Sequence, residues 1–421
     1  MSHRTQRSGR STPPARRSGR STARDATLNA AFTAIVSSIR RDGGGLASVP
    51  DPLEAELFAS GILAMWHGDV LQGSEPYEIL GTAIIRRLAR KRDPDTLAVL
   101  LAIAAIATPP FSDAARQAIE HLRSASIPEP LWSPTIRRPA LVDAWISTDE
   151  LDDQSHLLAA FAYEHRPPHA INLIIDANFN GLIRDAFVAY DPEKVRREWI
   201  RASGLPIRPL SEQALADRLG RGIEMFDTYL DPPVTDEAEQ LMPLLRARLR
   251  LLPAPRPIDT PEVSEAEREA LTAAFAASPQ AAALGEIDGY PATDLARWFI
   301  DFACDYGAGD PLRWSPIAVE ILLTDWLPRK VVLESGEIDA VPGVLRSFVH
   351  HAADRKGLAS HVFAETLEAI DRFAPDFAEG MADEDRAGPA KEIALAMRTS
   401  GIDLTDDAAV QRWIEERNRA P

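Results

Sequence analysis

The sequence contains only one cysteine, Cys304, among 421 residues. One thiol cannot close a disulfide within the chain, and chains without disulfides are typical of a reducing compartment. Cys304 follows an apolar stretch with helical spacing, so we expect a small buried side chain there rather than a nucleophile. These features predict a cytoplasmic protein.

Long apolar runs are also missing. The longest spans residues 97–107 and ends before Thr108-Pro109-Pro110, whereas a helix needs about 20 apolar residues to cross a bilayer. We therefore expect a buried helix at 97–107 and no membrane partner. The basic start of the chain does not predict a secretion signal, because residues 28–39 are interrupted by polar side chains and have the spacing of an amphipathic helix.

Several motifs of known chemistry do not occur. Gly43-Gly44-Gly45 is not followed by the Lys-Ser/Thr pair of a phosphate-binding loop, and there is no Gly-x-Ser-x-Gly elbow. A dense group of potential metal ligands does occur towards the C-terminus: His350, His351, Asp354, His361 and Glu365. Its spacing fits no zinc motif, and the helix dipole favours cations near a helix C-terminus, so we predict no metal and no resident cofactor.

Charge is distributed unevenly. The first 24 residues carry seven arginines and no acidic side chain, so the rest of the chain carries −24 although the whole carries −17. An acidic body repels nucleic acid and anionic membranes, which leaves the tail or a local basic cluster to bind a polyanion. The candidate nucleic-acid-binding cluster is Arg86, Arg87, Arg90, Lys91 and Arg92. No aromatic residue lies between these cations, which disfavours base stacking.

Hydrophobic spacing predicts a mainly α fold, a multi-helical protein with a small α+β segment, containing an antiparallel sheet, in the middle. Asp51 and Ser264 are predicted N-caps, the second in a capping box with Glu267. Proline-rich stretches at 126–139 and 253–261 indicate boundaries. The predicted division is a disordered Arg-rich tail at 1–26, a helical domain at 27–125, the α+β segment with helices at 139–252, and a helical C-terminal domain at 259–421.

One stretch of the C-terminal domain has a clear apolar stripe. Leu295, Trp298, Phe299, Phe302 and Tyr306 recur at the spacing of one helix face. We expect these side chains to belong to the core rather than to a cofactor site.

The middle segment contains three short apolar runs, at 157–163, 170–175 and 182–189, separated by turn-forming residues at 167–168 and 178–181. Short apolar runs bounded by Pro, Asn and Gly are typical of strands joined by turns. They predict the small antiparallel sheet.

Asp176 begins the pattern Asp-Ala-Asn-Phe-Asn-Gly, which matches the opening of a calcium-binding EF-hand loop. The twelfth position is Phe187, which cannot supply the required carboxylate, and Arg184 occupies the ninth. Asn and Gly also favour positive φ, so a hairpin turn explains the same residues. We favour the turn over a calcium site.

An alternative interpretation makes this segment an active site. Metal-dependent nucleases of the PIN type and phosphatases of the HAD type begin with a similar strand–Asp–x–Asn/Asp step, and converging carboxylates there hold Mg²⁺. The candidate catalytic residues are Asp176, Asn178, Asp185 and His169. Both families need a parallel sheet with further acidic residues at later strand ends, whereas the sequence after residue 190 is mostly helical in pattern.

Two stretches resemble uncharacterised proteins of high-GC actinobacteria, a family with no assigned activity. The stretches contain His169-Ala170, Asp176-Ala177-Asn178 and Asp185-Ala186-Phe187 at 157–187, and Asp310-Pro311-Leu312-Arg313-Trp314-Ser315-Pro316 at 305–330. The resemblance covers under a fifth of the chain. It implies a cytosolic bacterial origin, and it implies no fold, cofactor or catalytic residue.

The sequence as a whole favours a non-enzymatic scaffold or regulatory module that binds a protein partner, because the helical surface is extensive and no convergent catalytic set is present. Two alternatives stay open. One is a metal-dependent nuclease or phosphatase centred on Asp176, which would use Mg²⁺. The other is nucleic-acid binding through the basic tail and the cluster at 86–92.

Overall fold

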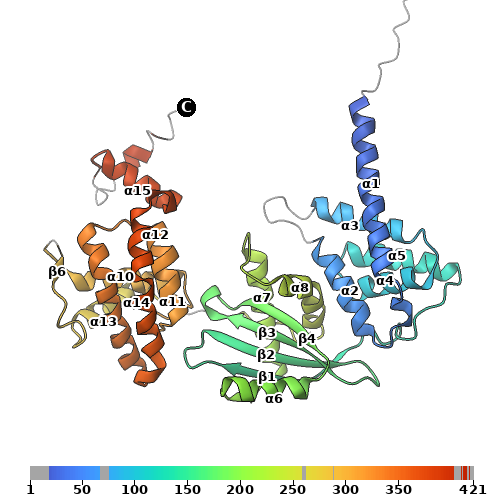
Figure 1. Ribbon diagram of the computed structural model, residues 1–421, viewed down its shortest axis with the longest axis horizontal. Coiled ribbons are helices and arrows are strands. Elements are labelled where there is room, and N and C mark those ends of the chain that lie inside the picture. Colours follow the sequence, from blue (N-terminus) through green and yellow to red (C-terminus); the bar gives the residue numbers. More distant parts are fainter. Residues whose placement is uncertain are drawn as a thin grey trace, which may run out of the picture. The chain divides into compact units, whose positions relative to one another are not determined.

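The computed structural model describes residues 19–66, 75–257, 262–287, 289–402, 409, 411–414 and 417. Contacts divide the chain into two compact units, Met1–Arg138 and Pro139–Pro421, each described here by itself. The expected mainly α fold with a small antiparallel sheet in the middle is confirmed (Figure 1). Residues 1–18 of the expected disordered tail lie outside the described residues, and the first helix begins at Gly19, within that segment.

The N-terminal unit is built from helices. They are α1 (Gly19–Asp42), α2 (Pro52–Ala64), α3 (Glu75–Leu88), α4 (Pro94–Ile106) and α5 (Phe111–Ser124). The carboxylate of Asp51 accepts a hydrogen bond from the Leu53 amide and caps α2, as expected from the sequence. Helix α4 is buried on nearly all sides between α2 and α5, which explains its continuous apolar sequence. Along the part of the chain that the structure describes, no helix combines the length and apolar character needed to cross a membrane.

The second unit begins with a five-stranded antiparallel sheet in the order β4-β3-β2-β1-β5. Its strands are β1 (Ala140–Thr148), β2 (Gln154–Ala162), β3 (His169–Asp176), β4 (Leu182–Ala189) and β5 (Ile207–Pro209). The three apolar runs predicted as strands correspond to β2, β3 and β4. Strands β1 and β5 are additional, and β5 consists of three residues that pair only with β1 in the described chain.

Helices cover both faces of this sheet (Figure 1). They are α6 (Pro192–Ser203), α7 (Glu212–Thr228) and α8 (Asp236–Leu249). Helix α6 packs its Trp199 against a small apolar cluster that includes Trp145 and Leu158. Helices α7 and α8 cover the other face and contact β4. The sheet is therefore buried on both faces, which accounts for strands that are apolar without strict alternation.

The rest of the second unit is helical. Its elements are α9 (Glu265–Ala276), a short hairpin of β6 (Glu286–Ile287) and β7 (Tyr290–Pro291), α10 (Ala296–Asp305), α11 (Pro316–Ile321), α12 (Leu327–Lys330), α13 (Ser335–Lys356), α14 (Ser360–Ala382) and α15 (Pro389–Thr399). The predicted capping box of Ser264 and Glu267 opens α9. The core of this part contains a group of packed aromatic rings, among them Phe275, Trp314 and Phe348.

The apolar stripe on α10 is only partly buried. Phe299 and Phe302 lie in the core as expected, but Trp298 is 39% exposed and Tyr306 is 49% exposed. Both residues occupy the edges of the stripe, and their rings lie against Trp326 at centroid distances of 6.4 and 5.6 Å. Helical spacing alone does not distinguish the centre of such a stripe from its edge.

Gly222 tests the packing of α7 on the sheet. A Cβ at this position would overlap Cγ1 of the buried Ile183 on β4. Gly222→Ala should therefore lower the free energy of unfolding by about 1–3 kcal/mol through overpacking. Gly343→Ala on α13 is the matched control, since nothing lies within 4 Å of its Cβ position, and it should raise stability by up to about 1 kcal/mol. Urea denaturation measures both changes, and equal effects would contradict this packing.

Candidate functional site

Asp176 is the last residue of β3 and forms the turn that leads into β4. Its Oδ1 accepts a hydrogen bond of 2.9 Å from the Asn178 amide. Asn180 and Gly181 follow with φ of 55° and 84°, the left-handed conformation that Asn and Gly adopt most readily. The sequence pattern is thus used as a hairpin turn, as favoured above.

The carboxylate of Asp176 is buried and ion-paired. Its side chain is 1% exposed, and Oδ2 lies 3.2 Å from Nη1 of Arg184, whose guanidinium covers the ring of Phe179. Burial raises the pKa of Asp176, while the Asn178 hydrogen bond and the charge of Arg184 act in the opposite direction. A carboxylate held in this way stabilises the turn.

Asn178 connects this turn to a second one. Its Nδ2 donates to Oδ1 of Asp153 at 2.9 Å, and its Oδ1 accepts from Nη1 of Arg313 at 3.2 Å. Both ends of the amide are therefore engaged. Asp153 lies at the end of the loop between β1 and β2, next to β3, so the two turns are joined at one edge of the sheet.

Arg313 supplies most of the hydrogen bonds of this network. Its Nη2 lies 2.5 Å from Oδ1 of Asp153, and both side chains are only 9% exposed. The same guanidinium donates to the carbonyl oxygens of Leu151 and Asp152 at 2.6 and 3.0 Å. Burial raises the pKa of Asp153, and its hydrogen bonds to Ser315 and Asn178 and the charge of Arg313 oppose that rise. Arg313 thereby fastens the C-terminal helical part to the β1–β2 loop.

The other two predicted catalytic residues lie elsewhere. Asp185 is opposite Ile174 in the sheet, and its Oδ1 accepts hydrogen bonds from the Ala186 amide and the Thr235 hydroxyl. His169 is at the opposite end of β3 from Asp176, roughly 23 Å away at the usual rise of a strand. In the described part of the chain, no group of three or more His, Cys, Asp or Glu residues could hold a metal ion. The structure brings Asp176 and Asn178 together and leaves Asp185 and His169 apart.

His169 is buried between aromatic rings. Its imidazole stacks on Phe161 and Tyr163 at centroid distances of 6.4 and 5.5 Å. Neither ring nitrogen has a hydrogen-bond partner among the described residues. Burial, reinforced by the positive charge of Arg248, lowers the pKa of His169 to about 3. The imidazole is therefore neutral and packs as an aromatic side chain.

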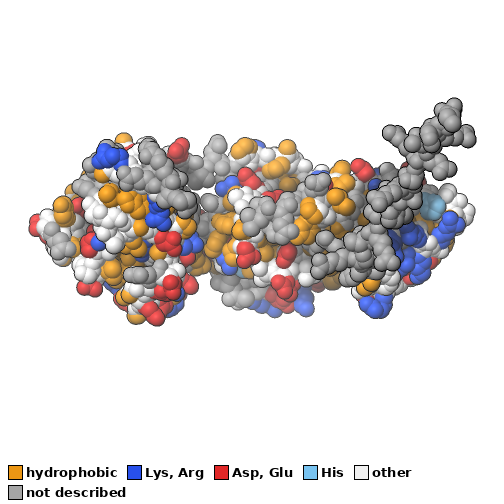
Figure 2. Space-filling model, turned by 90° about the horizontal axis from the view of Figure 1, so that it is seen from above, with side chains coloured by type: hydrophobic (Ala, Val, Ile, Leu, Met, Phe, Trp, Pro, Cys, Tyr) orange, Lys and Arg blue, Asp and Glu red, His pale blue; other side chains and the backbone are white. Residues whose placement is uncertain are grey.

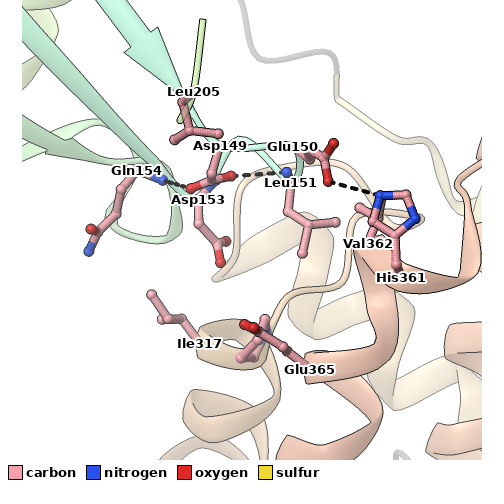
Figure 3. Close-up of a pocket in the computed structure, with 11 residues that line it drawn as sticks. Asp149, Glu150, Leu151, Asp153, Gln154, Leu205, Ile317, His361, Val362 and Glu365 are labelled. Atoms are coloured by element: carbon pink, nitrogen blue, oxygen red, sulfur yellow. Dashed lines mark hydrogen bonds and ion pairs between the residues drawn. The ribbon is translucent and has the colours of Figure 1, made fainter. Parts of the chain in front are cut away.

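A pocket of about 450 Å³ adjoins the Arg313 network. Its walls come from the β1–β2 loop and from α11 and α14, and none of its lining residues is a lysine or arginine. The lining residues are Asp149, Glu150, Leu151, Asp153, Gln154, Leu205, Pro316, Ile317, His361, Val362 and Glu365. Figure 3 shows Leu151, Ile317 and Glu365 directed towards the space between these walls.

The four carboxylates of this pocket have different roles. Asp149 accepts hydrogen bonds from the backbone amides of its own loop, and Asp153 is bound by Arg313 and Asn178. Glu150 and Glu365 are exposed and come from opposite walls. Oε2 of Glu150 lies 3.9 Å from Nε2 of His361 (Figure 3). Glu150 and Glu365 are the carboxylates that can meet a ligand.

The potential metal ligands towards the C-terminus, which include His351, His361 and Glu365, also divide into buried and exposed side chains. His351 is buried against Phe275 and Phe348, and burial lowers its pKa. His361 and Glu365, which the sequence places on one helix face, both line the pocket. This pocket was not predicted, because its other wall lies about 200 residues earlier in the chain and no local pattern connects the two.

The basic cluster lies in the N-terminal unit, at the end of α3 and in the turn after it. Arg86, Arg90, Lys91 and Arg92 are exposed, whereas Arg87 is half-buried and donates to the Thr33 hydroxyl at 2.9 Å. Four of the five predicted residues therefore face solvent.

No family model matches this sequence, and neither does any curated protein or solved structure. The geometry of the pocket and the charge around it are the observations that bear on function.

Arg313→Ala tests the buried network. Removing the guanidinium leaves the buried carboxylate of Asp153 without its ion-pair partner, which should lower the free energy of unfolding by about 3–5 kcal/mol. Adding Asp153→Asn removes the stranded charge and should recover part of the loss. Lys194→Ala removes an exposed pair with Glu198 and should cost less than about 1 kcal/mol. Urea denaturation compares the variants, and a loss no larger than that of Lys194→Ala would disprove the structural role.

His169→Phe tests the buried imidazole. Because the pKa of His169 is about 3 in the folded chain and 6.5 ordinarily, only the unfolded chain takes up the proton between these values. The histidine should therefore cost stability as pH falls from roughly 6.5 towards 3, by about 1.4 kcal/mol for each pH unit. His169→Phe should remove this dependence, whereas His165→Ala, at a side chain that is 91% exposed, should keep it. Urea denaturation at several pH values measures the slopes, and parallel slopes in all three proteins would contradict the assignment.

Proposed function

We propose that this chain is a protein-interaction module, and that its second unit binds a basic segment of a protein partner in the acidic pocket. The observation that supports this proposal is the pair of exposed carboxylates, Glu150 and Glu365, on opposite walls of a pocket without lysine or arginine. Two carboxylates can accept the several N–H groups of a guanidinium or ammonium group at once.

The rest of the lining suits the stem of a long basic side chain. Leu151, Leu205 and Ile317 provide apolar surface in the same pocket. Lysine and arginine carry three or four methylene groups that pack on such surface while the charged end stays near polar groups. The volume of about 450 Å³ lies in the range of sites that enclose one small group.

Charge outside the pocket favours a basic segment over an isolated cation. Residues 139–421 contain 50 acidic and 28 basic side chains, which gives the second unit a formal charge of −22. A surface of that sign attracts cationic chains over a distance of about 10 Å and increases their rate of association. A peptide with several basic residues gains from this field more than a single cation does. We place this activity in the cytoplasm, because the chain has one cysteine and needs no disulfide.

The test uses a fluorescein-labelled octapeptide of alternating Gly and Arg, measured by fluorescence anisotropy with the full chain. The combined variant Glu150→Gln and Glu365→Gln should weaken binding at least about tenfold, which corresponds to about 1.4 kcal/mol. Glu320→Gln combined with Glu368→Gln removes the same charge from exposed positions on α11 and α14 outside the pocket. This control should retain nearly all of the affinity.

Two results would contradict the proposal. One is equal binding of the peptide by the pocket variant and by the control variant. The other is binding of free arginine or spermine in the pocket without binding of the peptide, which would make the site one for a small cation.

A further inference from the structure

The N-terminal unit brings together two basic segments that are far apart in the sequence. Arg40, near the end of α1, donates from Nη2 to the carbonyl oxygens of Arg87 and Leu88 at 3.1 and 3.0 Å. Arg87 in turn donates to the hydroxyl of Thr33 on α1. These bonds hold the last turns of α1 against the C-terminal end of α3. The exposed cations of the cluster at 86–92 therefore lie beside the last turns of α1.

The surface formed in this way is strongly cationic. Its exposed cations, which we call the basic face, are Arg86, Arg90, Lys91 and Arg92. Among these cations, Lys91 forms an ion pair with Asp93. Figure 2 shows Lys and Arg side chains gathered over the N-terminal unit.

The positive charge on the basic face is greater than the dipole of α3 requires. Cations at a helix C-terminus complement its dipole, and Arg40 already binds the last carbonyl groups of α3. Further like charges repel one another, and Arg90, Lys91 and Arg92 are consecutive in the turn that follows α3. A polyanionic ligand would offset that repulsion.

We propose that the basic face binds the phosphate backbone of a nucleic acid. Three of its four cations are arginines, whose planar guanidinium groups bind phosphate oxygens in pairs. An anionic membrane is less suitable, because Ile79, the large apolar side chain exposed on α3, lies about two turns before Arg86. Within residues 86–92, which the structure describes in full, no apolar side chain is exposed, whereas membrane-surface helices use such side chains as anchors. This inference concerns the N-terminal unit and does not depend on the function proposed for the pocket.

The experiment measures fluorescence anisotropy of a labelled 20-bp DNA duplex and, separately, of an RNA hairpin, with the full chain between about 50 and 200 mM salt. The combined variant Arg86→Glu, Arg90→Glu and Arg92→Glu should weaken binding at least about a hundredfold at the lowest salt. It should also reduce the slope of log K against log salt by about 3 for the duplex, since each phosphate contact contributes about 0.9. Comparison of the two probes identifies the preferred nucleic acid.

Arg116→Glu combined with Arg123→Glu is the control. Both residues are exposed on α5 and ion-paired with Asp113 and Glu129, so this variant should bind almost as the unchanged chain does. Circular dichroism checks that both variants are folded. Affinity and slope equal to those of the unchanged chain in the Arg86, Arg90 and Arg92 variant would overturn the proposal. So would binding of phosphatidylserine vesicles by the unchanged chain without binding of either nucleic acid.

Discussion

The buried guanidinium of Arg313 is the interaction on which the second unit depends. It binds one carboxylate, one side-chain amide and two backbone carbonyl groups, so nearly all of its donors are used where water does not compete. Ser315, two residues later, caps α11, and α11 supplies one wall of the pocket. The same contact therefore fastens the β1–β2 loop and sets the position from which the opposite wall begins. An acidic pocket with walls from distant segments requires such a connection.

Local signals in the sequence predicted much of the fold. The caps at Asp51 and Ser264 and the apolar runs of β2, β3 and β4 depend on residues within a few positions of one another. Strand β1 was not predicted, because its exposed first half is followed by four consecutive buried residues and no alternation results. Strand β5 has three residues, too few to show a hydrophobic alternation in the sequence. It is a strand because it pairs with β1.

The candidate sites could be predicted from the sequence less completely than the fold. The pattern at Asp176 is compatible with a turn and with a metal site, and residues outside the pattern decide between them. Asn178 is bound by Arg313, which lies 135 residues further along the chain. The basic cluster was found from composition, but its membership changed in the folded unit, where Arg87 turns inward to α1. Sequence identifies charged residues, whereas packing decides which of them face a ligand.

Leu151 combines two roles that the chain keeps chemically independent. Its carbonyl oxygen accepts a hydrogen bond from Arg313, and its side chain lines the pocket. Every residue type offers the same carbonyl oxygen, so a different side chain at this position would leave the hydrogen bond from Arg313 in place. Related chains could therefore diverge in what they recognise while keeping one architecture. Asp153 has no such freedom, because Arg313 and Asn178 both bind its carboxylate.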